Sequence, residues 1–123
     1  MEEYFAKIPL IEKSTKEYGI LTKITEYIEK NHRKKITLMD IAKTLGYDYN
    51  YTSRYFHNTF NMSFTDFVNI YRLESALLLL EETDKSITCV ALESGFQSIR
   101  TFNDLFKKTM STSPMKYRKA SRK

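Results

Sequence analysis

The sequence contains few residues that interrupt helices and few that build covalent or metal sites. Its 123 residues include one cysteine, three glycines and two prolines. The single cysteine excludes an internal disulfide, a thiolate zinc site and a redox pair. A sandwich or barrel needs a turn signal every ~8–12 residues, so the scarcity of glycine and proline argues against an all-β fold.

A membrane segment is also missing from the sequence. The longest apolar run covers only residues 76–80, whereas a helix needs ~20 apolar residues to cross a bilayer. The N-terminus lacks the apolar core of a signal peptide. Hydrophobic residues nevertheless make up 41% of the chain, which is too many for a disordered protein. We therefore expect a soluble, helical, cytoplasmic chain that forms one domain or two small units.

Positive charge is concentrated near the C-terminus. Twenty basic and fifteen acidic residues give a net charge of +5. Seven basic residues and no acidic residue follow Asp104, so the first 106 residues carry thirteen basic and fifteen acidic groups. A positive field at one end is typical of a partner for a polyanion, because neutralising phosphates releases condensed counterions. The alternative is a lysine-rich tail that only aids solubility.

Apolar spacing and capping residues predict an all-α fold of about seven helices. Ile20, Ile24 and Ile28 lie on one face of a helix that starts near Tyr18. Six later helices have a capping side chain at their start. These caps are Thr37, Asp48, Ser63, Ser86, Ser98 and Ser113. The long apolar helix covers about 64–82 and the last helix about 114–120, while residues 1–17 are expected to be a linker or the stump of an N-terminal region.

An internal repeat groups these helices into two units. The residues Thr37, Leu38, Ile41, Ala42, Gly46 and Tyr47 are matched 49 residues later by Ser86, Ile87, Val90, Ala91, Gly95 and Phe96. Each copy is a short helix, a glycine turn and a second helix, which is the helix-turn-helix unit. The units cover about 37–61 and 86–109. The helix between them would be about 28 Å long, and successive major-groove faces of DNA lie ~34 Å apart, so one duplex could accept both units.

Seven short motifs resemble the C-terminal DNA-binding domain of the AraC/XylS family of bacterial transcription regulators, over about residues 18–120. They are Ile-Ala-x-x-x-Gly-Tyr (41–47), Tyr-Thr-Ser-Arg-Tyr-Phe (51–56), Arg-Leu-x-x-Ala (72–76), Ser-Ile-Thr-x-Val-Ala (86–91), Gly-Phe-Gln-Ser (95–98), Phe-Asn-Asp-Leu-Phe-Lys-Lys (102–108) and Ser-Pro-x-x-Tyr-Arg (113–118). The resemblance implies sequence-specific binding to double-stranded promoter DNA, commonly activation, with RNA polymerase as a further partner.

The same resemblance sets expectations for the rest of the molecule and shows where this chain departs from the family. Family members usually add an effector-binding or dimerisation domain, for which this chain has no room. We therefore expect a stand-alone member or an excised DNA-binding half, monomeric as given and without metal or cofactor. Departures are Thr52 at a usually apolar position, Asn61 and Ser111 at usual glycine positions, and Asp104 where Arg or Lys is common.

Exposed polar side chains on the second helix of each unit are the candidates for base contacts. They are Asn50, Ser53 and Arg54 in the first unit, and Arg100, Thr101, Asn103 and Asp104 in the second. Arginine can donate twice to guanine and asparagine can pair with adenine. Asp104 could repel DNA, accept from a cytosine amino group or hold Arg100 in place. The alternatives without a role in DNA binding are a surface salt bridge for Arg54 and a solvent-exposed helix face for Asn103 and Asp104.

Candidates for phosphate contacts are polar groups at helix ends. They are Tyr49, Lys107, Lys108, Ser113 and Lys116. Such contacts position a protein on DNA without reading its sequence. His32 and His57 lack ligand spacing and are expected at the surface, and Cys89 is expected to be packed and inert.

Three other function classes can be compared with a DNA-binding regulator on features of the sequence. A helical protein-interaction module with an incidental basic tail would show little salt dependence and an exposed apolar groove. An enzyme is disfavoured because the sequence lacks the residue patterns of a catalytic site: it has no glycine-rich phosphate loop, metal cluster or nucleophile with a paired histidine. RNA binding is disfavoured because the aromatic residues fall at buried helical spacing and not on an open stacking surface.

Overall fold

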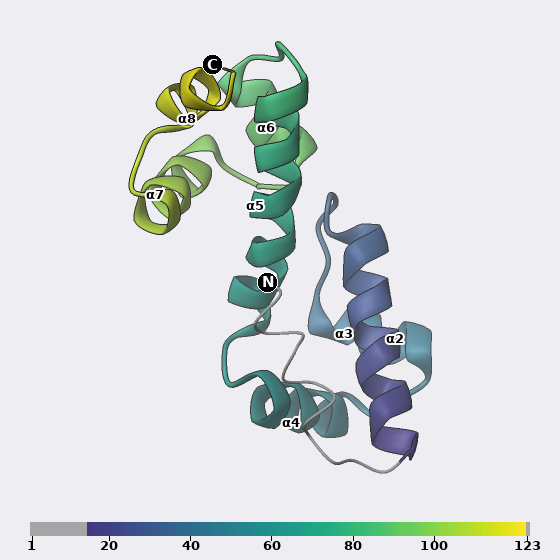
Figure 1. The fold of residues 1–123 in the computed structure, drawn as a ribbon. Coiled ribbons are helices and arrows are strands. Elements are labelled where there is room, and N and C mark those ends of the chain that lie inside the picture. Colours follow the sequence, from purple (N-terminus) through teal and green to yellow (C-terminus); the bar gives the residue numbers. More distant parts are fainter. Residues whose placement is uncertain (1–14, 123) are drawn as a thin grey trace.

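The computed structural model describes residues 15–122, which form seven helices and no strand (Figure 1). The helices are α2 (Thr15–Asn31), α3 (Leu38–Leu45), α4 (Tyr49–Phe60), α5 (Phe64–Glu82), α6 (Ile87–Glu93), α7 (Ile99–Met110) and α8 (Pro114–Ser121). The predicted all-α fold of two helix-turn-helix units on a central helix is confirmed. Most of the predicted linker, residues 1–14, lies outside the described residues. Helix α2 begins three residues before the predicted start, where the polar residues 15–17 carry no apolar period.

Each predicted capping residue starts its helix as expected. The Thr37 hydroxyl accepts from the Asp40 amide at 3.1 Å, and the Asp40 carboxylate accepts from the Thr37 amide at 2.9 Å. Asp48, Ser63, Ser86, Ser98 and Ser113 each accept from the amide three residues later. These bonds satisfy amides that have no partner within their own helix, so the helix starts are fixed locally by sequence.

The duplicated turns have the same backbone bonds. In the first unit the Tyr47 amide donates to the Ala42 carbonyl at 2.9 Å, and in the second the Phe96 amide donates to the Ala91 carbonyl at 3.1 Å. Both alanines are buried, which lets the paired helices cross closely. Gly46 has the left-handed φ of 76° that ends α3.

Helix α5 belongs to two hydrophobic cores at once. Its first half packs Phe67 and Tyr71 against residues of α2, α3 and α4. Its second half packs Ala76 and Leu80 against residues of α6, α7 and α8. Figure 1 shows α2, α3 and α4 around one end of α5 and the remaining helices around the other. The two units are therefore joined by a continuous helix and not by a loop.

A polar junction links the two units beside α5. Arg72 is buried, and its guanidinium donates from Nε to the His32 carbonyl at 2.7 Å and from Nη2 to the Lys34 carbonyl at 3.0 Å. Burial lowers the pKa of Arg72, and the carbonyl oxygens offset part of the cost of desolvating the charge. A Cβ at Gly95 would lie 2.2 Å from the same His32 oxygen, so the turn of the second unit packs directly on the loop between α2 and α3.

The prediction that His32 lies at the surface is wrong. Its side chain is 8% exposed, and ring atom Nε2 lies 2.7 Å from the Ser75 hydroxyl. The loop after α2 folds onto α5 and carries the imidazole with it. His57 is exposed as predicted. Cys89 is half-buried and donates to Glu93, which raises the pKa of the thiol; a raised pKa reduces the reactive thiolate.

Part of the basic C-terminal charge is structural. Arg118 Nε and Arg122 Nη2 each donate to the Leu80 carbonyl at 3.1 Å, and Arg122 also pairs with Asp84 at 2.5 Å. These cations bind the C-terminal carbonyls of α5, where the helix dipole favours positive charge. Helix α8 is thereby fastened to α5, and two of the basic groups near the C-terminus are committed to the fold.

Candidate nucleic-acid interface

Helix α4 has a buried face and an exposed polar face. Thr52 and Phe56 are almost fully buried, whereas Asn50 and Arg54 are exposed on the opposite side and Ser53 is half-buried at the edge. The hydroxyl of Thr52 donates to the Asp48 carbonyl at 2.8 Å. This bond satisfies the hydroxyl inside the helix, which explains how threonine occupies a position that is usually apolar.

Helix α7 repeats this arrangement fifty residues later. Phe102 and Phe106 are fully buried, and Arg100, Thr101, Asn103 and Asp104 are all exposed. Arg100 and Asp104 are one helical turn apart and so lie on one line of the surface. The structure therefore brings the four predicted base-contact residues of this unit onto one solvent-facing side.

The exposed faces of α4 and α7 are not covered by other parts of the described chain. Within residues 19–122, no hydrogen bond or ion pair is made by the side chains of Asn50, Arg54, Arg100 and Asp104. The Thr101 hydroxyl accepts from Ser98 at 3.1 Å and remains exposed. Polar groups that lack internal partners at a helix surface are available to an external one.

The two helices are held apart by α5. Figure 1 shows α4 at the start of α5 and α7 beside its second half. Because α5 has 19 residues, it measures about 28 Å along its axis. The length of this connecting helix is comparable with the ~34 Å between successive major-groove segments on one side of DNA.

The predicted phosphate-contact residues are distributed over three helices and differ in availability. Lys107 and Lys116 are exposed, and Tyr49 is 40% exposed. Ser113 is half-buried, and its hydroxyl already accepts from the Lys116 amide at 3.2 Å. Lys108 is exposed but lies at the edge of a groove along α5.

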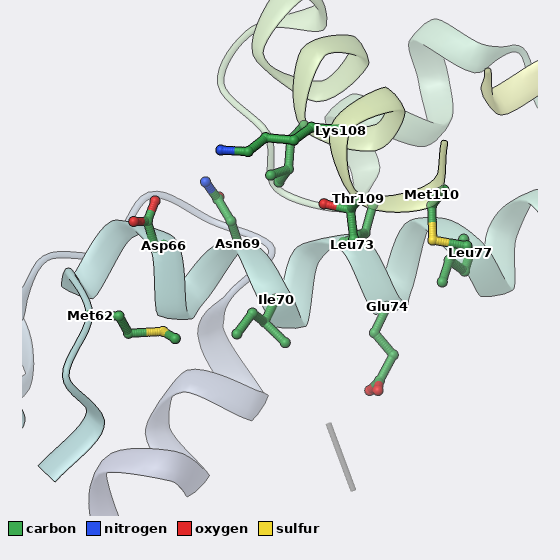
Figure 2. Close-up of a pocket in the computed structure, with 11 residues that line it drawn as sticks. Met62, Asp66, Asn69, Ile70, Leu73, Glu74, Leu77, Lys108, Thr109 and Met110 are labelled. Carbon is green, nitrogen blue, oxygen red and sulfur yellow. The ribbon is translucent and has the colours of Figure 1, made fainter. Parts of the chain in front are cut away.

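An apolar groove of about 610 Å³ runs along α5 and was not anticipated as a specific feature of the sequence. Its apolar lining comes from α5, from Met62 just before α5, and from Leu105 and Met110 of α7, and its polar edge includes Asp66, Asn69, Glu74 and Lys108. Figure 2 shows the Lys108 side chain extending above Asp66 and Asn69. Lys108 therefore shares the edge of this groove with acidic residues, whereas Lys107 does not line it. The groove escaped sequence analysis because residues distant in the chain, such as Met62 and Met110, form it together.

The junction residues Arg72 and Gly95 were also missed as functional positions. They fix the loop between α2 and α3 against the turn of the second unit. The available signal was an arginine flanked by Tyr71 and Leu73 in a heavily buried helix, since a buried charge needs fixed partners. Among the described residues, no group of three or more histidine, cysteine or acidic side chains could hold a metal ion, and no helix could span a membrane.

Comparison with known proteins assigns the fold to a family. A helix-turn-helix domain family matches residues 41–120. The chain belongs to the AraC-type helix-turn-helix family. This family and its fold are those of DNA-binding transcription regulators, which are not enzymes.

Two curated relatives of this AraC-type chain are regulators. An uncharacterized HTH-type transcriptional regulator of Staphylococcus aureus (strain MSSA476) is 31% identical over 98 residues, which are 80% of this chain and 13% of the relative. The melibiose operon regulatory protein of Escherichia coli (strain K12) is 32% identical over 95 residues, 77% of this chain and 32% of the relative. The chain thus spans less than a third of the length of these relatives.

Solved structures show the same architecture. The C-terminal domain of AraT, a response regulator from Geobacillus stearothermophilus, superposes with a TM-score of 0.73 at 30% identity, covering 82% of this chain and 84% of that one. The DNA-binding domain of AdpA, solved with a target DNA, superposes with a TM-score of 0.71 at 23% identity, covering 84% and 92%. The AdpA likeness shows the fold alone.

Proposed function

We propose that this AraC-type chain is the DNA-binding domain of a transcription regulator and that α4 and α7 read two adjacent major-groove segments of promoter DNA. The observation that carries this proposal is the pair of uncovered polar faces at equivalent positions of two duplicated units, which are joined by one helix of 19 residues, about 28 Å long. The AdpA domain, which has this fold, was solved with a target DNA.

The proposal gives each unit its own reading residues. Arg54 donates to guanine and Asn50 pairs with adenine in the first segment, with Ser53 beside them. In the second segment Arg100, Thr101 and Asn103 face the bases. Tyr49, Lys107, Lys108, Ser113 and Lys116 contact phosphates and set the register.

The DNA-binding domain would cover about residues 18–120. Its first unit is about 37–61, its linker helix about 64–82, its second unit about 86–109 and its last helix about 114–120, with residues 1–17 as a linker or the stump of an N-terminal region. This domain would act in the bacterial cytoplasm as an activator that works with RNA polymerase, would have no enzymatic activity, and would bind as a monomer because one chain carries both reading units.

Selection from random DNA duplexes tests the proposal. The chain should enrich a site of two segments about 10 bp apart, and binding should weaken steeply with salt because phosphate contacts release counterions. Arg54→Ala should relax one position of the first segment at a cost of about 1–3 kcal/mol. A selection that enriches no sequence would exclude the specific-regulator proposal.

A second candidate function, a helical protein-interaction module, is favoured by the apolar groove along α5. In that case the basic residues near the C-terminus serve solubility and the fold. The salt dependence of DNA binding separates the two candidates, since an interaction module would show only a shallow dependence.

A further inference from the structure

The two reading helices carry different chemistry at equivalent positions. Asn50 and Arg54 of α4 correspond to Arg100 and Asp104 of α7, each fifty residues later. All four side chains are exposed opposite the buried face of their helix. The arginine has therefore moved by one helical turn between the units, and an acid stands where the first unit has its arginine.

Asp104 is not used to hold Arg100. The structure shows two ion pairs among residues 19–122, Lys85 with Glu93 and Arg122 with Asp84. Arg100 and Asp104 lie one turn apart, at a spacing that permits an ion pair, yet they form none in this part of the chain. Asp104 also caps none of the described helices, and its side chain forms no hydrogen bond with another residue of 19–122. Its carboxylate is free for an external donor.

We propose that Asp104 selects a cytosine in the second DNA segment, an inference that rests on the proposed function. An ionised carboxylate can only accept hydrogen bonds. In the major groove cytosine presents its N4 amino donor, whereas guanine presents two acceptors and thymine an acceptor and a methyl group. Adenine has an amino group too, but its N7 acceptor lies beside it and repels the carboxylate. Cytosine is therefore the base from which the Asp104 carboxylate can accept a hydrogen bond with the least repulsion.

The surrounding charges allow an acid to approach DNA. Arg100 lies one turn before Asp104 and Lys107 lies three residues after it, both exposed on the same helix. These cations offset the repulsion between the carboxylate and nearby phosphates. Asp104 still opposes binding wherever no cytosine amino group meets it, so it penalises incorrect sites in addition to rewarding the correct one.

The test is a comparison of selected DNA motifs for the wild-type chain and for Asp104→Ala, Asp104→Asn and Arg100→Ala. The wild type should show cytosine at one position of the second segment. Asp104→Ala should lose the preference there by about tenfold. Asp104→Asn should shift the same position toward adenine, because asparagine pairs with its N6 and N7 atoms. Arg100→Ala should relax a different position, and all variants should retain the first segment.

The outcomes separate this inference from the proposed function. If the wild type enriches both segments and the Asp104 variants leave every position unchanged, only the cytosine contact is excluded. If Asp104→Ala and Arg100→Ala relax the same position, Asp104 acts through Arg100 and the inference is wrong. If the wild type enriches no segment, the proposed function fails first. Thermal melting of each variant checks folding, which an exposed substitution should leave intact.

Discussion

The carbonyl oxygen of His32 packs against the backbone of Gly95 so closely that a Cβ at Gly95 would lie 2.2 Å from it. The same oxygen accepts from Arg72. Two units that are built from separate cores therefore meet through backbone atoms, which have little freedom to adjust. This contact fixes the second unit relative to the first.

Replacing Gly95 should disturb that contact more than replacing its counterpart in the first unit. Gly95→Ala adds a methyl group against backbone at a φ of +104°, and we expect a loss of about 2–4 kcal/mol in the free energy of unfolding. Gly46→Ala is the matched control, because its φ is +76° but no atom lies within 4 Å of the added Cβ; it should cost about 1–2 kcal/mol. Urea denaturation measures both, and equal losses would contradict the steric argument.

Ser111 offers a route to stabilisation. It ends α7 with a left-handed φ of 58°, a conformation that costs side-chain-bearing residues energy and glycine little. Ser111→Gly should therefore raise the free energy of unfolding by about 0.5–1 kcal/mol and the melting temperature by about 2–5 °C. Asn61→Gly, at φ 52°, should gain less because asparagine tolerates this region better. A melting temperature that falls in Ser111→Gly would contradict the prediction.

Lys107 and Lys108 should differ in their effect on DNA binding. Lys107→Ala should weaken binding to all sequences alike and reduce the salt slope by about one, because it removes an exposed cation that lies outside the groove along α5. Lys108→Ala should have a smaller effect, since Lys108 lies over a groove edged by Asp66 and Glu74. Titrations of one duplex over a range of salt concentrations compare them. A larger slope change for Lys108→Ala would reverse the assignment.

Stability should respond to alkaline pH through Tyr117. Its hydroxyl donates to the Glu81 carboxylate, and this bond raises the pKa of Tyr117. The folded state therefore holds the proton more tightly than the unfolded state. The stabilisation is complete below the usual tyrosine pKa of about 10 and is lost as the pH rises through the raised pKa. The difference in melting temperature between wild type and Tyr117→Phe should narrow above that pH, and a constant difference would exclude this role.

Local features of the fold could be predicted because their causes are local in sequence. Capping side chains such as Thr37 act on amides three residues away, and the buried face of α7 follows from the spacing of Phe102 and Phe106. The internal repeat also indicates that α3 pairs with α4 and α6 with α7, which the apolar spacing of each helix alone does not show. Sequence reasoning also identified Asp104 as unusual, since acids rarely face a polyanion.

Long-range features could not be predicted in the same way. His32 is buried by Ser75, which lies 43 residues later, and a lone histidine in a polar run gives no sign of such a partner. Arg118 and Arg122 counted toward a basic tail, yet they bind the end of α5. Charge totals do not distinguish cations that face solvent from those that hold helices together.

The shared helix α5 has a consequence for how such a protein can change over time. An insertion of one residue in its middle would turn everything beyond that point by about 100° and advance it by about 1.5 Å. The exposed face of α7 would then be rotated relative to that of α4, although every side chain on α7 was unaltered. Substitutions can change which bases each unit recognises. The number of residues in α5, by contrast, fixes the rotation of one unit relative to the other, so few lengths of this helix are permitted.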